Sequence, residues 1–171
     1  VAFEAGVAAN ETGAMVSGMG CDFADFDGDG WPDIFLTDLM RDTFTLFVNQ
    51  GQGFFLDRTF PSGIGAASAG HSGWSTKLLD LDNDGAKDIF VAGSHVVDNV
   101  ALYSPGAKYE EGCFLYRNTG QGRIEDLSAR VGPDLLTPGA WRGVAVADLD
   151  NDGHLEVAVS RLNGSAALFA K

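Results

Sequence analysis

The 171-residue sequence predicts an all-β fold made of repeated antiparallel units. Short apolar runs rich in Val, Ile, Phe and Leu are bounded by glycine, which is typical of strands. No long segment repeats apolar residues at helical spacing. An acidic turn precedes such a run three times, as DFDGDGWPD from Asp25, DLDNDGAKD from Asp80 and DLDNDGHLE from Asp148. These observations together favour a repeated β architecture.

Each repeat is predicted to contain four strands, with the acidic turn between the first two. The first strands are expected at residues 19–25, 74–80 and 142–148, and the second at 33–37, 88–92 and 156–160. The third strands are expected at 44–48, 113–117 and 165–170. The turns NQGQG and NTGQG suit tight hairpins and lead to fourth strands at about 53–59 and 122–128.

The repeats start 55 and 68 residues apart, and the extra length lies in the second repeat, in a loop inserted at about 95–112. Four antiparallel strands that recur at this spacing are typical of β-propeller blades. We therefore expect residues 1–171 to form a partial propeller. Blade 1 would span about 19–60, blade 2 about 74–128, and blade 3 about 142–171 without its outermost strand.

Three blades are too few to close a ring, since propellers usually have four to eight blades. We therefore expect a further stretch of chain or a protein partner to complete the propeller. A piece of a longer chain, a subunit of a heteromer and a self-completing oligomer all remain open at this stage. The first residue is Val1, which fits either a removed leader or a piece of a longer chain.

The composition is acidic, with 24 Asp and Glu against 11 Lys and Arg and a formal charge of -13. This charge disfavours a nucleic-acid partner, which would require a basic face, and suits a cation. No apolar run reaches the ~18 residues that a bilayer-spanning helix needs, so no transmembrane segment is predicted. Cys21 and Cys113 each lie in a strand-like apolar run. Buried free thiols are the favoured prediction for them, and a disulfide is the alternative.

The acidic turns predict three calcium sites. Acids occupy positions 1, 3, 5 and 9 of every turn: Asp25, Asp27, Asp29 and Asp33; Asp80, Asp82, Asp84 and Asp88; Asp148, Asp150, Asp152 and Glu156. Four carboxylates so close together repel one another unless a cation gathers them, and Ca²⁺ takes six to eight oxygen ligands. Position 6 is always glycine, which permits a sharp turn. Position 7 (Trp31, Ala86 or His154) would offer its backbone carbonyl, so its side chain is free to vary.

Other metal loops fit less well. An EF-hand needs a glutamate at position 12, where this chain has Leu36, Val91 and Val159 in predicted strands. A dockerin-like loop fails for the same reasons, and Mg²⁺ would demand a tighter octahedral shell with retained waters. Weak calcium sites fill outside the cytosol, so we expect a secreted protein, extracellular or periplasmic.

The turn running into an apolar strand resembles the FG-GAP/VCBS repeat of integrin α-subunit propellers. The flanking segments GMGCDFADFDGDGWPDIFLTD, FLYRNTGQGRIEDLSARVG and WRGVAVADLDNDGHLEVAVSRLNG are similar to the ASPIC/UnbV group, which is related to cartilage acidic protein. The resemblance implies an exported calcium-bearing propeller, usually without known catalysis, whose twelve turn acids are calcium ligands. Such a propeller has about seven blades and a following module, whereas three blades are found here, and Glu156 stands where the pattern has aspartate.

Catalytic patterns are absent from the sequence. His71, His95 and His154 lack zinc-site spacing, and the serines show no nucleophile elbow. Carboxylates that hold a metal are poor general acids, so a glycosidase pair is rejected. We therefore predict a noncatalytic scaffold, binding module or subunit of a larger assembly.

A carbohydrate-active propeller enzyme, such as a polysaccharide lyase or hydrolase, is the alternative function. It would use His95, Lys108 and Tyr109 of the insertion. His95 is otherwise expected to be a hydrogen-bonded structural residue. A glycan is the second candidate partner, through a platform of Trp31, Trp74 and Trp141, although blade packing or plain surface exposure is the favoured role of these tryptophans.

Overall fold

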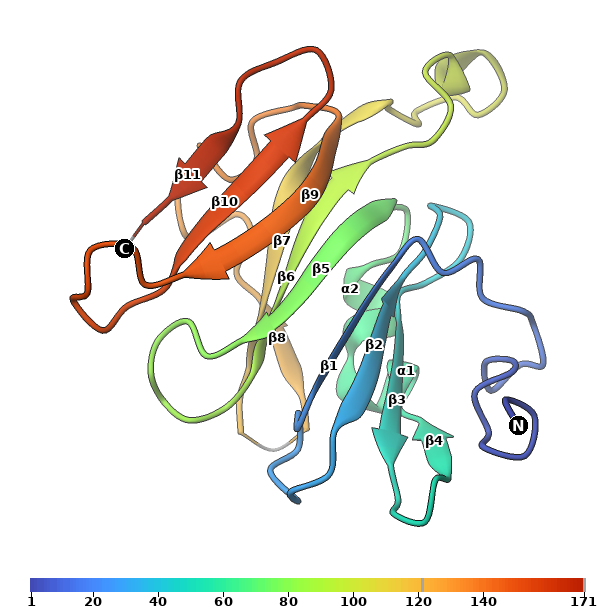
Figure 1. Ribbon diagram of the computed structural model, residues 1–171. Coiled ribbons are helices and arrows are strands. Elements are labelled where there is room, and N and C mark those ends of the chain that lie inside the picture. The colour runs from blue at the N-terminus through green and yellow to red at the C-terminus, as the bar shows by residue number, and fades with distance from the viewer. Residues whose placement is uncertain (121, 171) are drawn as a thin grey trace.

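Three antiparallel sheets stand side by side in the computed structural model, which describes residues 1–120 and 122–170 (Figure 1). The first sheet has the order β1-β2-β3-β4 and the second β5-β6-β7-β8. The third has the order β11-β10-β9. This is the arrangement of propeller blades, and it confirms the all-β prediction.

The strand bounds follow the predicted repeat closely. The first sheet contains β1 (Gly20–Ala24), β2 (Asp33–Thr37), β3 (Thr45–Asn49) and β4 (Phe55–Asp57). The second contains β5 (Gly73–Leu79), β6 (Asp88–Ser94), β7 (Glu110–Asn118) and β8 (Ile124–Asp126), and the third β9 (Trp141–Ala147), β10 (Glu156–Arg161) and β11 (Ala167–Phe169). The fourth strands are therefore shorter than predicted.

Short helices are the part of the fold that the sequence did not indicate. After β4 the chain forms α1 (Thr59–Ser62) and α2 (Ile64–Ala67), and the insertion between β6 and β7 carries the 3-10 helix η1 (Val100–Leu102). Helices this short span about one turn and leave no apolar periodicity to detect. Among the described residues, no helix is long and apolar enough to cross a membrane.

The first strands of the blades lie next to one another along the centre of the molecule (Figure 1). Asp22 of β1 holds β5 directly, since its Oδ1 pairs with Lys77 Nζ at 3.0 Å and its Oδ2 accepts the Leu78 N–H at 2.8 Å. A Cβ on Gly20 would lie 1.9 Å from the carbonyl oxygen of Trp74. Only glycine therefore allows β1 and β5 to approach this closely.

The hydrophobic core lies between the blades. Blades 1 and 2 bury one cluster, in which Phe35 and Leu46 meet Ile89 and Val91. Blades 2 and 3 bury a second, in which Phe90 and Leu115 meet Val157 and Val159. Each blade is thus stabilised mainly by burial against its neighbour, as expected for propeller blades.

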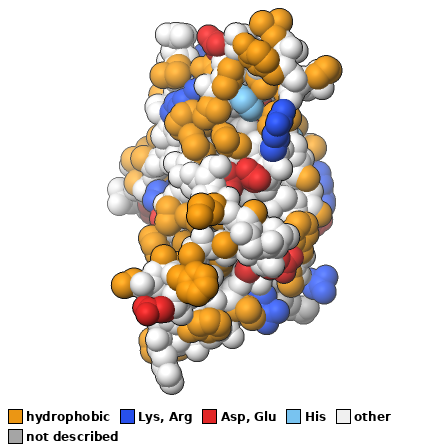
Figure 2. Space-filling view, turned by 90° about the vertical axis from the view of Figure 1, so that its right-hand side faces the viewer, with side chains coloured by type: hydrophobic (Ala, Val, Ile, Leu, Met, Phe, Trp, Pro, Cys, Tyr) orange, Lys and Arg blue, Asp and Glu red, His pale blue; other side chains and the backbone are white. Residues whose placement is uncertain are grey.

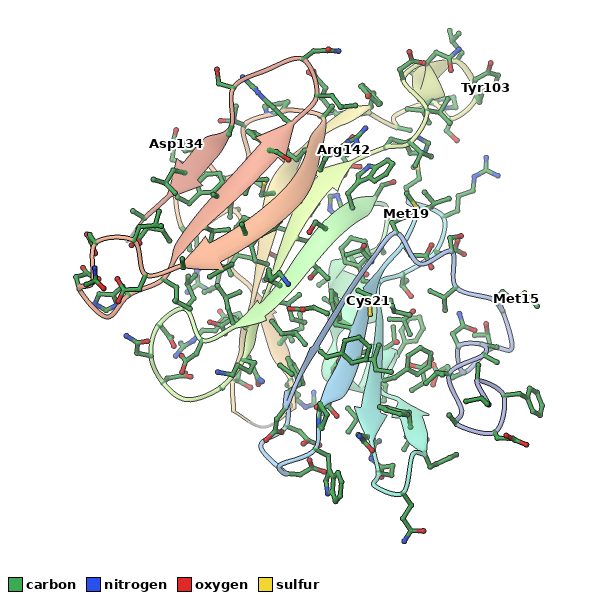
Figure 3. The ribbon with its side chains drawn as sticks, in the orientation of Figure 1. Met15, Met19, Cys21, Tyr103, Asp134 and Arg142 are labelled. Carbon is green, nitrogen blue, oxygen red and sulfur yellow. The ribbon has the colours of Figure 1, made fainter. Side chains whose placement is uncertain are left out.

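The two cysteines are both free, and only one behaves as predicted. Cys113 of β7 is buried, and burial raises the pKa of its thiol to about 12. Cys21 of β1, labelled in Figure 3, is exposed, so its predicted burial is wrong. The strand alternation turns Cys21 and Phe23 to the side of blade 1 that faces away from blade 2, and no described blade covers that side.

Candidate metal centres

The three acidic turns are β-hairpin loops at the same end of their blades (Figure 1). They connect β1 to β2, β5 to β6 and β9 to β10. The register of these pairs brings position 9, the first residue of the second strand, opposite the residue just before position 1: Asp33 faces Ala24, Asp88 faces Leu79 and Glu156 faces Ala147. One local sequence pattern has therefore folded into one local structure three times.

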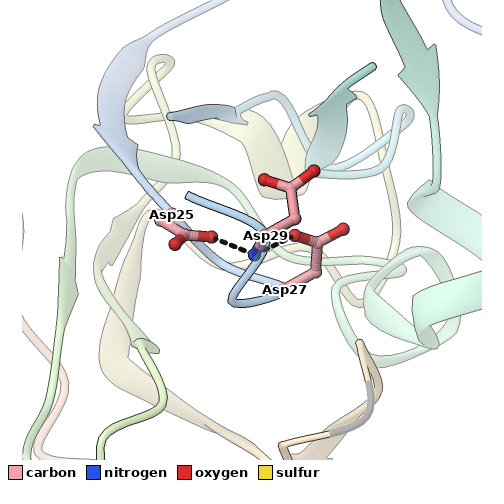
Figure 4. Close-up of side chains that lie close together, drawn as sticks. All are labelled: Asp25, Asp27 and Asp29. Carbon is pink, nitrogen blue, oxygen red and sulfur yellow. Dashed lines mark hydrogen bonds between the residues drawn. The ribbon is translucent and has the colours of Figure 1, made fainter. Parts of the chain in front are cut away.

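The carboxylate at position 1 organises each loop by accepting backbone N–H groups. In the first loop, Asp25 Oδ2 accepts the Gly30 N–H at 2.9 Å. Its Oδ1 accepts the Asp29 N–H at 3.1 Å, the bond drawn between these two residues in Figure 4. The corresponding bonds to Asp80 are both 3.0 Å, and those to Asp148 are 3.0 and 3.1 Å. The chain is thereby wrapped around the first aspartate in every repeat.

Position 5 closes the second half of the loop. Its Oδ1 accepts the position 7 N–H: Trp31 N to Asp29 at 2.8 Å, Ala86 N to Asp84 at 2.9 Å, and His154 N to Asp152 at 2.8 Å. The position 7 side chain takes no part in these bonds, and that of Trp31 is exposed. The side chain at position 7 is therefore free to vary, as the three unlike residues there indicate. Ligation of calcium by the backbone carbonyl of position 7 remains a prediction.

Two positions in each loop have left-handed backbone conformations. The glycine at position 6 has φ of +91° (Gly30), +92° (Gly85) and +88° (Gly153), as the turn prediction required. Position 4 has φ of +81° (Gly28), +61° (Asn83) and +59° (Asn151), a second left-handed position beyond the predicted one. The signal was present in the sequence, because glycine and asparagine are the residues that adopt this conformation most readily.

The folded loops gather carboxylates into three clusters. In each cluster, one carboxylate oxygen from each of three residues lies within 4.8 Å of the others, and each cluster has one half-buried member. Their members are Asp25, Asp27 and Asp29; Asp80, Asp82 and Asp84; and Asp148, Asp150 and Glu156. Figure 4 shows the first cluster, in which Asp25 and Asp27 both accept the Asp29 N–H. Groups of hard oxygen ligands at this separation fit a Ca²⁺ ion.

The acid at position 9 has a structural role that the sequence did not reveal. It is buried in all three repeats, and in the first two neither Asp33 nor Asp88 joins the cluster. Asp33 accepts the Phe26 N–H at 2.7 Å and the Asn49 N–H at 2.8 Å, and Asp88 accepts the Leu81 N–H at 3.3 Å and the Asn118 N–H at 2.8 Å. These bonds fasten the loop to the third strand of its own blade.

Burial disfavours the charged form of three acids in the first two loops. Burial, despite two backbone hydrogen bonds, raises the pKa of Asp88 to about 6, and burial likewise raises the pKa of Asp33. The pKa of Asp27 is raised too, first by desolvation and then by the negative charge of Asp29. A bound divalent cation would favour the charged form of these carboxylates and offset the repulsion between them.

The structure brings some of the other candidate residues together: the His95 N–H donates to the Tyr109 carbonyl at 2.9 Å, and the Arg142 guanidinium lies 4.1 Å from the ring centroid of Trp74. His95 is buried and its Nδ1 accepts the Val97 N–H at 3.0 Å, which is the structural role favoured by the sequence. Trp141 lies in the second core cluster and Trp31 is exposed beside the first loop, so these two have packing and surface roles, whereas Trp74 is half-buried beneath Arg142. The Tyr109 hydroxyl accepts a hydrogen bond from Arg142 at 3.2 Å, whereas the Lys108 side chain forms no hydrogen bond or ion pair with the described residues.

Comparison with known families supports the repeat assignment. The FG-GAP-like repeat matches residues 25–91 and again residues 80–159. The chain therefore belongs to the family of proteins built from FG-GAP-like repeats. A comparison with curated protein sequences gave no match.

Proposed function

We propose that this chain is a calcium-stabilised, noncatalytic propeller module that acts as a scaffold, binding module or subunit of a larger assembly. The observation that carries the proposal is the threefold recurrence of one oxygen-rich loop, with the same hydrogen bonds and the same left-handed residues each time. The flanking segments quoted above support membership of the ASPIC/UnbV group within the family.

The residues have separate tasks in the proposed sites. Positions 1, 3 and 5 supply side-chain oxygens to the ion in the first two loops, whereas in the third loop position 9 (Glu156) takes the place of position 5 (Asp152) in the cluster. Position 9 also anchors the loop to its blade through backbone N–H groups, as Glu156 does with the Leu149 N–H. Calcium supplies the positive charge that lets these carboxylates stay together, and it thereby stabilises the hairpin between the first two strands.

The proposed location follows from the proposed ion. Calcium sites on surface loops of extracellular modules are often weak, with Kd of about 10⁻⁴ to 10⁻³ M, and such sites are filled only where calcium is abundant. We therefore place the module outside the cytosol, in an extracellular or periplasmic setting.

The uncovered blade faces support a partner or a further stretch of chain. Phe26 at position 2 is buried against blade 2, and Leu81 is partly buried at the corresponding place beside blade 3. Leu149, at the same position in blade 3, is 60 % exposed, and Phe23 on the opposite open face is 61 % exposed. A further blade at each of these two faces would cover it, as blade 2 covers one face of blade 1 and blade 3 covers one face of blade 2.

Further apolar side chains are exposed on the side of the molecule where the N-terminal segment and β4 lie (Figure 2). Phe3, Met15 and Phe54 are among the large apolar residues exposed in these parts of the chain. We include this side in the proposed binding surface of the module.

Calorimetric titration of the chelator-treated protein with CaCl₂ tests the proposed metal function. We expect three bound ions, and the variants Asp29→Asn, Asp84→Asn and Asp150→Asn should each lose one. Asp98→Asn, in the inserted loop, is the control and should retain all three. Absence of calcium binding by the wild-type chain would overturn the proposal.

A further inference from the structure

One arginine reaches into the second acidic cluster. Arg117 lies in β7 directly before Asn118, and its Nη2 is 2.9 Å from Asp82 Oδ2 and 3.1 Å from Asp84 Oδ2. Both aspartates are members of the cluster formed by the second loop. The guanidinium therefore binds one carboxylate oxygen on each of two residues that a calcium ion at this cluster would use.

The first loop has no such cation in the described structure. The residue before Asn49 is Val48, which is the counterpart of Arg117 and is buried in the core between blades 1 and 2. Among the described residues, no lysine or arginine nitrogen lies within 4.0 Å of a carboxylate oxygen of Asp25, Asp27 or Asp29. Two loops with the same acids at the same positions thus differ in their nearest positive charge.

We propose that Arg117 competes with calcium for the second loop, so that this loop binds calcium more weakly than the first loop does. The inference rests on the proposed calcium function and adds a difference between the sites. Calcium entry at the second loop must either displace the guanidinium from two charge-assisted hydrogen bonds or place a divalent ion beside it. The first loop has no such pairing to break, since Arg58 and Arg123 line the same pocket as Asp27 and Asp29 without an ion pair to them among the described residues.

The pairing also has a consequence for the ion-free protein. Arg117 partly neutralises the second loop, and hydrogen bonds from the Ala86 N–H and from Arg117 lower the pKa of the Asp84 carboxyl. The guanidinium thus takes over part of the cation's role when calcium is scarce. As calcium rises, the first loop fills before the second.

Terbium luminescence can read the two loops separately, with Tb³⁺ as the probe for calcium. Trp31 at position 7 is a natural sensitiser for the first loop, and Ala86→Trp places an indole at the equivalent position of the second. The first loop is read in the wild-type protein through Trp31, and the second loop is read in a Trp31→Phe, Ala86→Trp variant. The luminescence of the first loop should reach half-saturation at a lower Tb³⁺ concentration than that of the second. Equal midpoints, or a lower midpoint for the second loop, would overturn the inference.

A charge-matched comparison then tests Arg117 itself. In the Trp31→Phe, Ala86→Trp background, Arg117→Gln should tighten Tb³⁺ binding and its displacement by Ca²⁺ by roughly threefold to tenfold. Arg130→Gln is the control, because Arg130 pairs with Glu125 on the surface of the same blade and its loss changes the net charge equally. An unchanged or weaker affinity in Arg117→Gln contradicts the inference.

The failure of this inference is distinguishable from failure of the proposed function. If the wild-type chain shows no calcium heat and no sensitised luminescence, the metal function itself is wrong. If all loops bind ions but the two reporters have the same midpoint, only the role of Arg117 is wrong. Circular dichroism in chelator verifies that each variant is folded before it is titrated.

Discussion

At the scale of single residues, the acids of each loop divide into two groups with different tasks. The acids at positions 3 and 5 are exposed in all three loops, whereas Asp33, Asp88 and Glu156 at position 9 are buried and hold backbone N–H groups. Sequence alone presents these acids as equivalent ligands. Without an ion, positions 1 and 5 hold hydrogen bonds within the exposed loop, whereas position 9 is the buried acid that ties the first two loops to the third strand of their blades.

Substitution at Asp33 and Asp29 separates the two tasks. Asp33→Asn should destabilise the calcium-free protein by about 1–3 kcal/mol, because an amide can accept only one of the two buried N–H groups that Asp33 satisfies. Asp29→Asn retains the acceptor for the Trp31 N–H and should change stability by less than about 0.5 kcal/mol. Urea unfolding in chelator measures both, and equal losses would contradict the division.

The raised pKa of Asp88 predicts an unusual pH dependence in chelator. Its value of about 6 in the folded chain exceeds the ordinary 3.8, so the folded state binds the proton more tightly than the unfolded state does. The contribution of Asp88 to stability is therefore fully present below pH about 4 and is lost as pH rises through about 6. Urea unfolding at pH 5 and pH 7 should show this difference, on the order of 1 kcal/mol, and Asp88→Asn should remove it.

Calcium should reverse this trend, because the ion binds the deprotonated carboxylates. With saturating calcium, stability should fall as pH is lowered from 7 to 5. A calcium-loaded protein that gains stability over the same range would show that these carboxylates are not ligands.

At the scale of the elements, the close approach of β1 and β5 depends on one glycine. Gly20→Ala would place a methyl group 1.9 Å from the Trp74 carbonyl oxygen, so the two strands must separate. We expect a loss of about 1–3 kcal/mol in urea unfolding, as for other overpacked sites. Cys21→Ala, at the exposed neighbouring residue of the same strand, is the control and should be nearly neutral. Similar losses for both variants would mean that β1 does not depend on this contact.

The elements also show what the sequence could and could not predict. The loops and second strands were predictable because their causes are local: Asp25 binds the N–H groups of residues only three to five positions away. The contact between Arg117 and Asp82 was not predictable, because it depends on the pairing of β7 with β6, two strands that are separated in sequence by the inserted loop. Its only signal was an arginine where the first repeat has Val48.

Burial at the blade faces was equally hidden from the sequence. The alternation along β1 predicts that Cys21 and Phe23 share a face, but it does not say whether a neighbour covers that face. In blades 2 and 3 the corresponding face is covered by the preceding blade, and in blade 1 it is open. Cys21 is exposed, contrary to the prediction, because it lies on this open face of blade 1.

At the scale of the whole molecule, the open faces of blades 1 and 3 predict association of the isolated chain. We expect light scattering with millimolar calcium to give a mass at a multiple of 18.0 kDa. Leu149→Asp should reduce this association, because it places a charge on the open face of blade 3. Leu102→Asp is the control, since Leu102 is exposed in the insertion rather than on a blade face. A stable wild-type monomer of 18.0 kDa would show that these faces need no covering blade.

The central claim is that calcium holds these blades in shape, and thermal unfolding with and without the ion tests it most directly. The melting temperature should be compared in millimolar CaCl₂ and in chelator at constant ionic strength. A site occupied at 100 times its Kd adds about 2.7 kcal/mol, so even one filled loop should raise the melting temperature by roughly 5 °C or more. A melting temperature that is the same in calcium and in chelator would contradict the assignment of the three loops as calcium sites.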